Sequence, residues 1–319
     1  MLQFLDLLVE DFADEWLTKA MFHYRWHHAE DAAHAAPLLI HWQQPQMPRD
    51  QVPAMGAAIA QRQISRLHVV GSSALTAPVI ESSYVRLLGI LDRIIERQGF
   101  VMGPRPAASD FALYGQLTQL GLVDPSPSRL LAQHSPRLRA WLERAEDLSG
   151  QSAGDWLPRE DVAAHLGELL AEIGRVYAPF LLANAKALTQ GQDHFETTID
   201  GQRWAQPVFP YQLKCLQVLG SARAALSAAD RAALDALLQG SGCDSRADFA
   251  PEGARPVSCL LGNRLFPKGD HPFGKNRREA TPSRPRFSRC RGEPLSDATA
   301  CRGRSSCPPG SPERPRSSR

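Results

Sequence analysis

The chain has 319 residues, of which 43% are hydrophobic, enough to form the core of one large domain or two ordinary ones. Its formal charge is +2, but residues 1–250 carry 21 Lys and Arg against 28 Asp and Glu, whereas residues 251–319 carry 15 against 6. The acidic N-terminus lacks the features of a secretory signal, and no apolar run reaches the roughly 18 residues of a membrane span. These properties exclude a membrane-spanning protein and predict a soluble, cytoplasmic one with two unlike parts.

Hydrophobic periodicity predicts helices from the N-terminus onward. Apolar side chains recur at three- and four-residue steps over about 3–30, and Pro37 is expected to close this region. A weaker, alanine-rich helix is expected between about 53 and 70. A continuous apolar stripe then predicts a helix over 78–98, which Gly99 ends.

The helical pattern continues after a loop rich in glycine and proline. A helix is expected from about Ala108 until the prolines of 124–127, and another from the N-cap Ser135 to Gly150. Residues 160–189 form the longest predicted helix, with a kink expected at Pro179.

The one strong β signal is a hairpin at about 195–206. Asp200-Gly201 suits a two-residue type I′ turn, which places Thr197 opposite Trp204. Two last helices are expected, over about 211–226 and from a capping Ser227 to Gly240. Because strands and helices do not alternate, the fold class is predicted to be all-α with one small hairpin.

The C-terminal part, residues 250–319, has a different composition. It holds four of the six cysteines and many prolines, with few aliphatic side chains, so we expect a disordered basic tail. Its cysteine spacing matches no paired zinc-ligand pattern, and Cys215 and Cys243 are expected to be ordinary buried thiols. Nucleic-acid binding by the tail is a weaker alternative to an extension without a partner. Such a composition is also typical of a gene read out of frame.

The residues richest in chemistry are 16–34, WLTKAMFHYRWHHAEDAAH. On a continuous helix His27, Asp31 and His34 would share one face, a geometry that could hold a divalent metal. No H-E-x-x-H motif supports this reading, so we expect no metal site and interpret the histidines as amphipathic packing residues. The aromatic side chains of this stretch are expected to form packing surface or the wall of an apolar pocket.

The stretch FVMGPRPAASDFALYGQL at 100–117, with Asp124-Pro125, Pro136-Arg137 and Trp141, resembles the C-terminal helical domain of glutathione S-transferases. The first helix, LVEDFADEWLTKAMFHYRW, looks like the first helix of that domain, and the resemblance extends over roughly 4–249. It implies a helical domain at 1–249 followed by the tail at 250–319.

In that family the loop and helix look like G-x-R-P-S-x-A-D-F, where serine and aspartate form a capping box. Asp110 falls on the acid of this box, but Ala107 occupies the serine position and cannot accept a hydrogen bond from the first-turn amides. Ser109 is therefore expected to supply a shifted cap beside Asp110.

The family resemblance also implies a thioredoxin-like domain that binds glutathione, the family's co-substrate. The chain begins at the first helix of the second domain, so we expect no glutathione site and no cofactor here. Glu81-Ser82 imitates the acid-serine pair of that site, but it lies at the start of the predicted 78–98 helix, where such residues favour the helix N-terminus.

Two hypotheses for function follow from the resemblance. The chain is either the substrate-side helical domain of a glutathione S-transferase-like enzyme, without independent conjugation, or a non-catalytic interaction module of the same fold. For the first, the resemblance implies that a small electrophile contacts His23, Tyr24 and Trp26. A homodimer is a possible assembly, and an altered gene would account for a truncated front.

Overall fold

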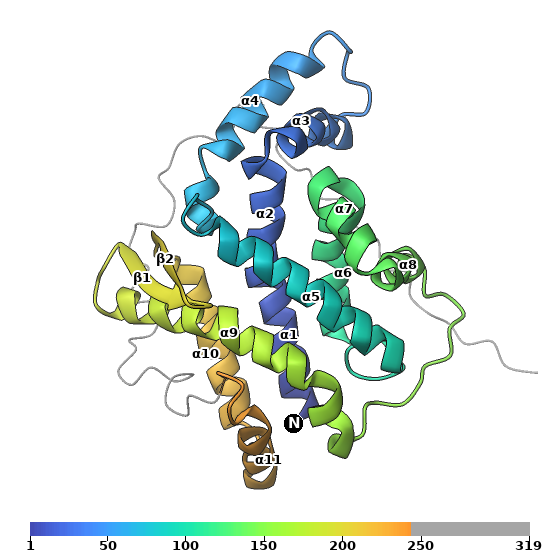
Figure 1. The fold of residues 1–319 in the computed structure, drawn as a ribbon, viewed down its shortest axis with the longest axis vertical. Helices are drawn as coiled ribbons and strands as arrows, with labels where there is room; N and C mark the ends of the chain where they lie inside the picture. The colour runs from blue at the N-terminus through green and yellow to red at the C-terminus, as the bar shows by residue number, and fades with distance from the viewer. Residues whose placement is uncertain (244–319) are drawn as a thin grey trace, which may run out of the picture. The chain divides into compact units, whose positions relative to one another are not determined.

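A computed structural model describes residues 1–243 of the chain. The predicted tail at 250–319 and its four cysteines lie outside these residues, as does the domain boundary at 249. The described part is mostly helical, with one small hairpin, which confirms the predicted fold class (Figure 1). The α-helices are α1 Leu2–Phe12, α2 Thr18–His27, α3 Ala29–Gln43, α4 Val52–Ile64, α5 Ala77–Gln98, α6 Ala108–Thr118, α7 Pro125–His134, α8 Pro136–Ala145, α9 Val162–Thr189, α10 Pro210–Ala224 and α11 Ala228–Leu238.

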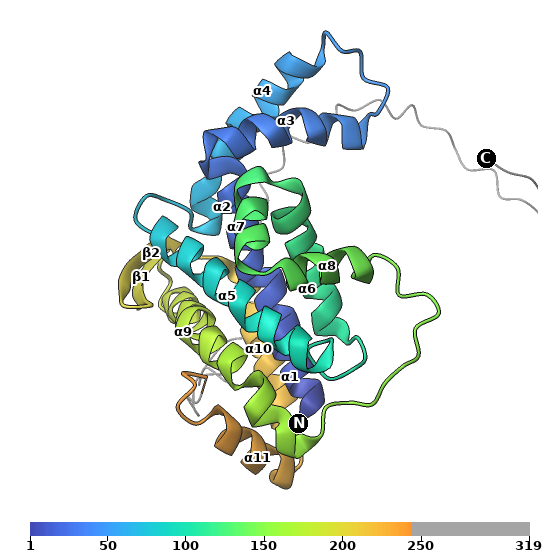
Figure 2. The ribbon, with the colours of Figure 1, turned by 45° about the vertical axis from the view of Figure 1, so that its right-hand side comes forward.

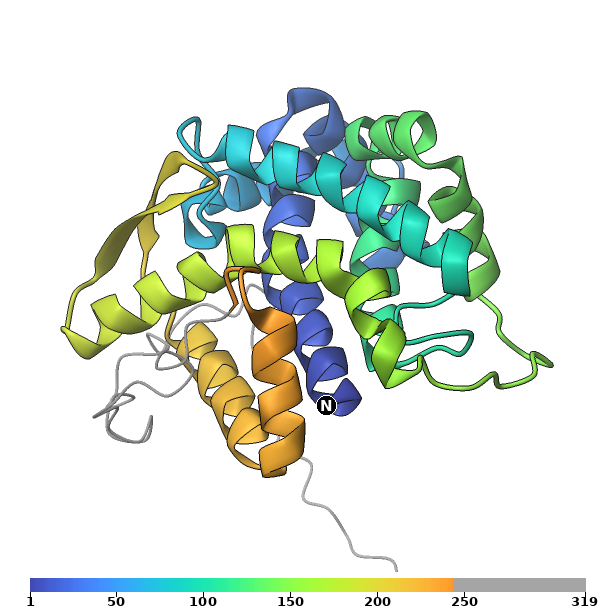
Figure 3. The same cartoon turned by 60° about the horizontal axis from the view of Figure 1, so that its bottom comes forward.

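A π-helical segment, Ala13–Leu17, joins α1 and α2 into one long helix through the middle of the bundle. In two views α5 and α9 cross this helix, and α6 lies along it on another side (Figures 1 and 2). In the view with the bottom turned forward, α10 and α11 lie under α9 (Figure 3), and α10 also contacts α1. The long central helix therefore packs against most of the other helices.

Trp16 shows how this helix organises the core. Its indole Nε1 donates to Ser83 Oγ of α5 at 3.1 Å, and its ring lies 5.9 Å from Phe180 of α9 and 5.4 Å from Trp204 of the hairpin. A buried indole needs a partner for its N–H, and the hydroxyl of Ser83 provides it. One side chain thus connects the central helix to α5, α9 and the hairpin.

The hairpin forms as the sequence predicts. Strands β1 (His194–Ile199) and β2 (Gln202–Pro207) pair antiparallel, with Thr197 opposite Trp204. Asp200 and Gly201 have φ angles of 50° and 72°, the positive values that a type I′ turn needs. The predicted caps Ser135 and Ser227 also form, since their hydroxyls accept from the amides of Leu138 and Asp230.

Two expectations for the N-terminal half are wrong. The first helical region does not run on to residue 30, because His28 is extended, with φ −91° and ψ 128°. Pro37 does not close it either, because α3 continues through Pro37 against α4. The two helices are in contact there, since Gly56 of α4 is buried and a Cβ built on it would lie 3.6 Å from the nitrogen of Pro37, an ordinary van der Waals distance. The prolines of 124–127 do end the preceding helical segment, which stops at Val123. Pro125 also begins α7, a helix that the periodicity did not indicate, because its missing N–H costs nothing at that position.

Helix α6 begins at the capping-box position without a capping side chain on Ala107. Asp110 forms its half of the box, because its carboxylate accepts from the amide of Ala107 at 2.9 Å and also from that of Val101 at 2.9 Å. The shifted cap at Ser109 does not form, since its buried Oγ has no hydrogen-bond partner. The reason is its position, inside the first turn rather than before it.

The amide that a capping serine would satisfy is bound from another helix instead. The carboxylate of Asp6, on α1, accepts from the amide of Ser109 at 2.9 Å. This amide is the second of the helix, one of the two that an N-cap side chain normally binds. The central helix therefore supplies the missing half of the cap on α6.

We expect Asp6→Ala to lower the free energy of unfolding by about 1–2 kcal/mol, because it leaves an amide of the first turn of α6 without an acceptor. Asp6→Asn retains one acceptor oxygen and should lower it less. Ser109→Ala should change it by less than about 0.5 kcal/mol, since the hydroxyl makes no hydrogen bond. Urea denaturation of the three variants checks this, and a larger loss in Ser109→Ala than in Asp6→Ala would contradict the cross-helix cap.

Candidate functional site

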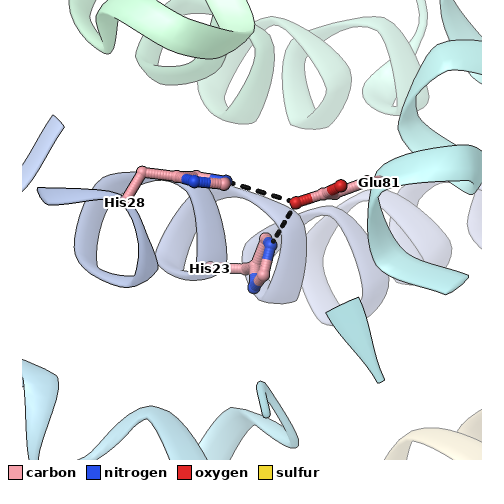
Figure 4. Close-up of side chains that lie close together, drawn as sticks. All are labelled: His23, His28 and Glu81. Atoms are coloured by element: carbon pink, nitrogen blue, oxygen red, sulfur yellow. Dashed lines mark hydrogen bonds and ion pairs between the residues drawn. The ribbon is translucent and has the colours of Figure 1, made fainter. Parts of the chain in front are cut away.

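A cluster of ionisable side chains lies where α2 ends against the start of α5. It consists of His23, His27, His28 and Glu81, with Ser72 beneath, and is called the histidine–glutamate cluster below. The two histidines of Figure 4 and Glu81 point their polar ends at one another. Among residues 1–243 the donor atoms of His23, His28 and Glu81 all lie within 4.8 Å of one another, so these three could hold a metal ion.

The break after α2 builds this cluster. On a continuous helix residues five apart point about 140° away from each other, so His23 and His28 could not face one point. The extended backbone of His28 turns its ring back toward Glu81. The two Nε2 atoms then lie 3.1 Å and 3.2 Å from the same oxygen, Oε1 of Glu81.

The other ring nitrogen of His23 is also held. Its Nδ1 lies 2.8 Å from the hydroxyl Oγ of the buried Ser72. The turn before Ser72 is fixed by Gly71, which has a φ angle of 78°, and by Thr76 Oγ1, which donates to the carbonyl of Gly71 at 2.5 Å. The orientation of the His23 ring is therefore set from both sides.

The cluster is buried at its base and open at its rim. The side chain of His23 is fully buried, whereas those of His28 and Glu81 are 36% and 40% exposed. His27 is exposed and stacks on His23, with ring centroids 4.6 Å apart. Burial lowers the pKa of His23 to about 4 and also lowers that of His27, so both imidazoles are neutral at pH 7.

The three residues predicted to contact an electrophile are all core residues. Tyr24 packs edge-on against His23 at 5.5 Å and against Tyr84 at 5.3 Å, so the structure brings His23 and Tyr24 together. Trp26 belongs to a separate apolar cluster with Ala32 and Ala35. With exposures of 0%, 3% and 3%, none of the three presents its side chain to solvent in this conformation.

The helix breaks at His28, so His27, Asp31 and His34 do not share one helix face, contrary to the expectation. Asp31 is fully buried and its carboxylate accepts from the amide of Ser126 at 2.8 Å, which caps the start of α7. Sequence reasoning missed the pairing of His28 with Glu81. Only their residue types could have suggested it, since the pairing depends on how α2 and α5 pack.

Two of the larger open cavities in the described part of the chain lie away from this cluster. One, of about 750 Å³, is between the end of α9 and β1, and includes Lys186 and Glu196. The other, of about 860 Å³, lies between α5 and α8 and is lined by Trp141 and three arginines. Neither includes a member of the histidine–glutamate cluster.

Lys19, one turn before His23, is the most deeply buried amine near the cluster. Its Nζ donates to the carbonyl of Val70 at 3.3 Å and lies 4.2 Å from the centre of the Phe180 ring. Burial lowers the pKa of Lys19 to about 7. The unfolded chain therefore binds more protons at this residue than the folded chain between about pH 7 and its ordinary pKa near 10.5.

We expect the free energy of unfolding to rise by up to about 3 kcal/mol from pH 7 to pH 10 because of Lys19, as the unfolded chain loses its proton. Lys19→Met should remove this rise and increase the free energy of unfolding at pH 7. Lys214→Met, at an exposed position of α10, should leave the rise unchanged. Urea titrations at both pH values check this, and equal slopes for wild type and Lys19→Met would contradict it.

None of the helices within residues 1–243 is both long enough and apolar enough to cross a bilayer. No curated protein and no solved structure matches the chain. The family model for the glutathione S-transferase, C-terminal domain, matches residues 54–144, which run from α4 through α8 and include the Asp110 cap of α6. The match covers less than a third of the chain and identifies residues 54–144 as similar to the glutathione S-transferase, C-terminal domain.

Proposed function

We propose that this protein acts as the substrate-side helical part of a glutathione S-transferase-like system, and that residues 1–243 do not conjugate glutathione by themselves. The observation that carries the proposal is the match to the C-terminal domain over a segment in which the Asp110 half of the capping box forms, with its carboxylate bound to two amides. The proposal that residues 1–243 do not conjugate glutathione by themselves rests on their strand content. Residues 1–243 form only a two-stranded antiparallel hairpin, which cannot build the sheet of a thioredoxin-like glutathione site.

In this proposal the electrophile binds at the histidine–glutamate cluster. Its rim, formed by His27, His28 and Glu81, is the part that a small electrophile can reach. His23 and Tyr24 pack beneath the rim and would position its side chains rather than touch the electrophile. Trp26 would likewise act indirectly, through its packing against α3 and α4. A location in the cytoplasm stays a prediction.

We expect residues 1–243 to show neither glutathione binding by calorimetry nor conjugation of a chloronitrobenzene electrophile above the uncatalysed rate. Joining a thioredoxin-like glutathione-binding domain to the N-terminus should restore turnover, and Glu81→Gln in that fusion should raise KM for the electrophile more than it lowers kcat. The fusion with Gln61→Glu, on an exposed part of α4, is the matched control. Conjugation by residues 1–243 alone would contradict the proposal.

A second candidate function is a non-catalytic interaction module, and one observation favours it. Tyr211 and Val218 lie two turns apart on the same face of α10 and are 55% and 54% exposed. Large apolar side chains on one exposed helix face are typical of a contact with another protein.

This second function predicts that the full chain sediments as an assembly larger than a monomer. Tyr211→Glu with Val218→Glu should return it to a monomer without changing its circular dichroism, because both side chains are exposed. Gln61→Glu, on exposed α4, should leave the assembly intact. A wild-type chain that is monomeric at all accessible concentrations and recovers no stoichiometric partner would contradict the module.

A further inference from the structure

We propose that the histidine–glutamate cluster is a binding site for one divalent first-row transition-metal ion such as Zn²⁺. The ligands are Nε2 of His23, Nε2 of His28 and Oε1 of Glu81. The proposal goes beyond the transferase-like role and does not depend on it. Imidazole nitrogen and carboxylate oxygen are donors that Zn²⁺ accepts, and three protein ligands with a fourth position left open are a common zinc arrangement.

The spacing of the donor atoms supports this assignment. Two ligands of a tetrahedral zinc, each about 2.0–2.1 Å from the metal, lie about 3.3 Å apart. The two Nε2 atoms already lie 3.1 Å and 3.2 Å from Glu81 Oε1. All three atoms lie within 4.8 Å of one another, so small rotations of the partly exposed His28 and Glu81 side chains would close the set around His23.

The partner of His23 on its other side supports the assignment independently. A metal-bound histidine needs its second ring nitrogen to carry the proton and donate it to an acceptor, which fixes both tautomer and ring orientation. Ser72 Oγ, 2.8 Å from Nδ1 and itself buried, is such an acceptor. The chain therefore provides a ligand set and an outer partner for its most buried member.

The exposure of the ligands shows where the open position lies. His23 is buried at the base, whereas Glu81 and His28 are partly exposed, so the fourth position of the metal faces solvent at the rim. Water or a small anionic ligand can occupy it. Because the ligands come from α2, from the break after it and from α5, a bound ion would also hold the end of α2 against α5.

The test is titration of the full chain with Zn²⁺ against a chromophoric chelator, together with the visible spectrum of the Co²⁺ form. We expect one equivalent of Zn²⁺ whose affinity falls at least about ten-fold in His28→Ala and in Glu81→Gln, and about ten-fold in Ser72→Ala. His41→Gln, a histidine exposed on α3, should change nothing. His28 and Glu81 are partly exposed, so their variants are expected to fold, which circular dichroism verifies.

The Co²⁺ spectrum separates this site from the six cysteines of the chain. Nitrogen and oxygen ligands in a tetrahedral set give visible bands without the thiolate-to-metal charge-transfer band that cysteine ligands add. Visible bands that are lost in His28→Ala and Glu81→Gln would support the proposal. Unchanged affinity in both variants, or a spectrum with the thiolate band that both variants retain, would overturn it.

Discussion

The described fold depends on satisfying the first-turn amides of α6 and α7, and these helices do not do so with their own cap side chains. Asp6 of the central helix accepts from the amide of Ser109, and Asp31 of α3 accepts from that of Ser126. A buried helix start without acceptors would cost free energy for every orphan amide. The start of each helix is therefore bound by a carboxylate that lies about a hundred residues earlier in the chain. These two hydrogen bonds connect α1 and α3 to the segment that matches the family model.

The same central helix leads from this framework to the candidate site. Trp16, Lys19 and His23 follow one another at three- and four-residue steps, so one face of the helix packs against α5, α9 and the hairpin and then reaches the cluster. The ring of His23 near its end is held by Ser72 and Glu81. A site at the end of a helix that packs into the core is held at its base and accessible at its rim, which suits the binding of a small ligand or ion.

Much of this fold could be predicted from the sequence, because local signals and packing agree. The stripe of α5, the caps at Ser135 and Ser227 and the turn at Asp200 each depend on a few neighbouring residues. The errors occur where distant contacts decide the outcome. Pro37 lies inside α3, which packs along α4, and Ala107 can begin α6 because Asp6 of another helix accepts from the amide of Ser109. The site was predictable only in part, since His23 was singled out but its pairing with Glu81 and His28 depends on the break after α2.

The most direct test of this account is a crystal structure of the full chain soaked with Zn²⁺, with anomalous diffraction measured on both sides of the zinc absorption edge. The account predicts one anomalous peak bonded to Nε2 of His23, Nε2 of His28 and Oε1 of Glu81, with Ser72 Oγ accepting from Nδ1 of His23. A map with no peak between these atoms, while zinc binds elsewhere on the protein, would contradict it.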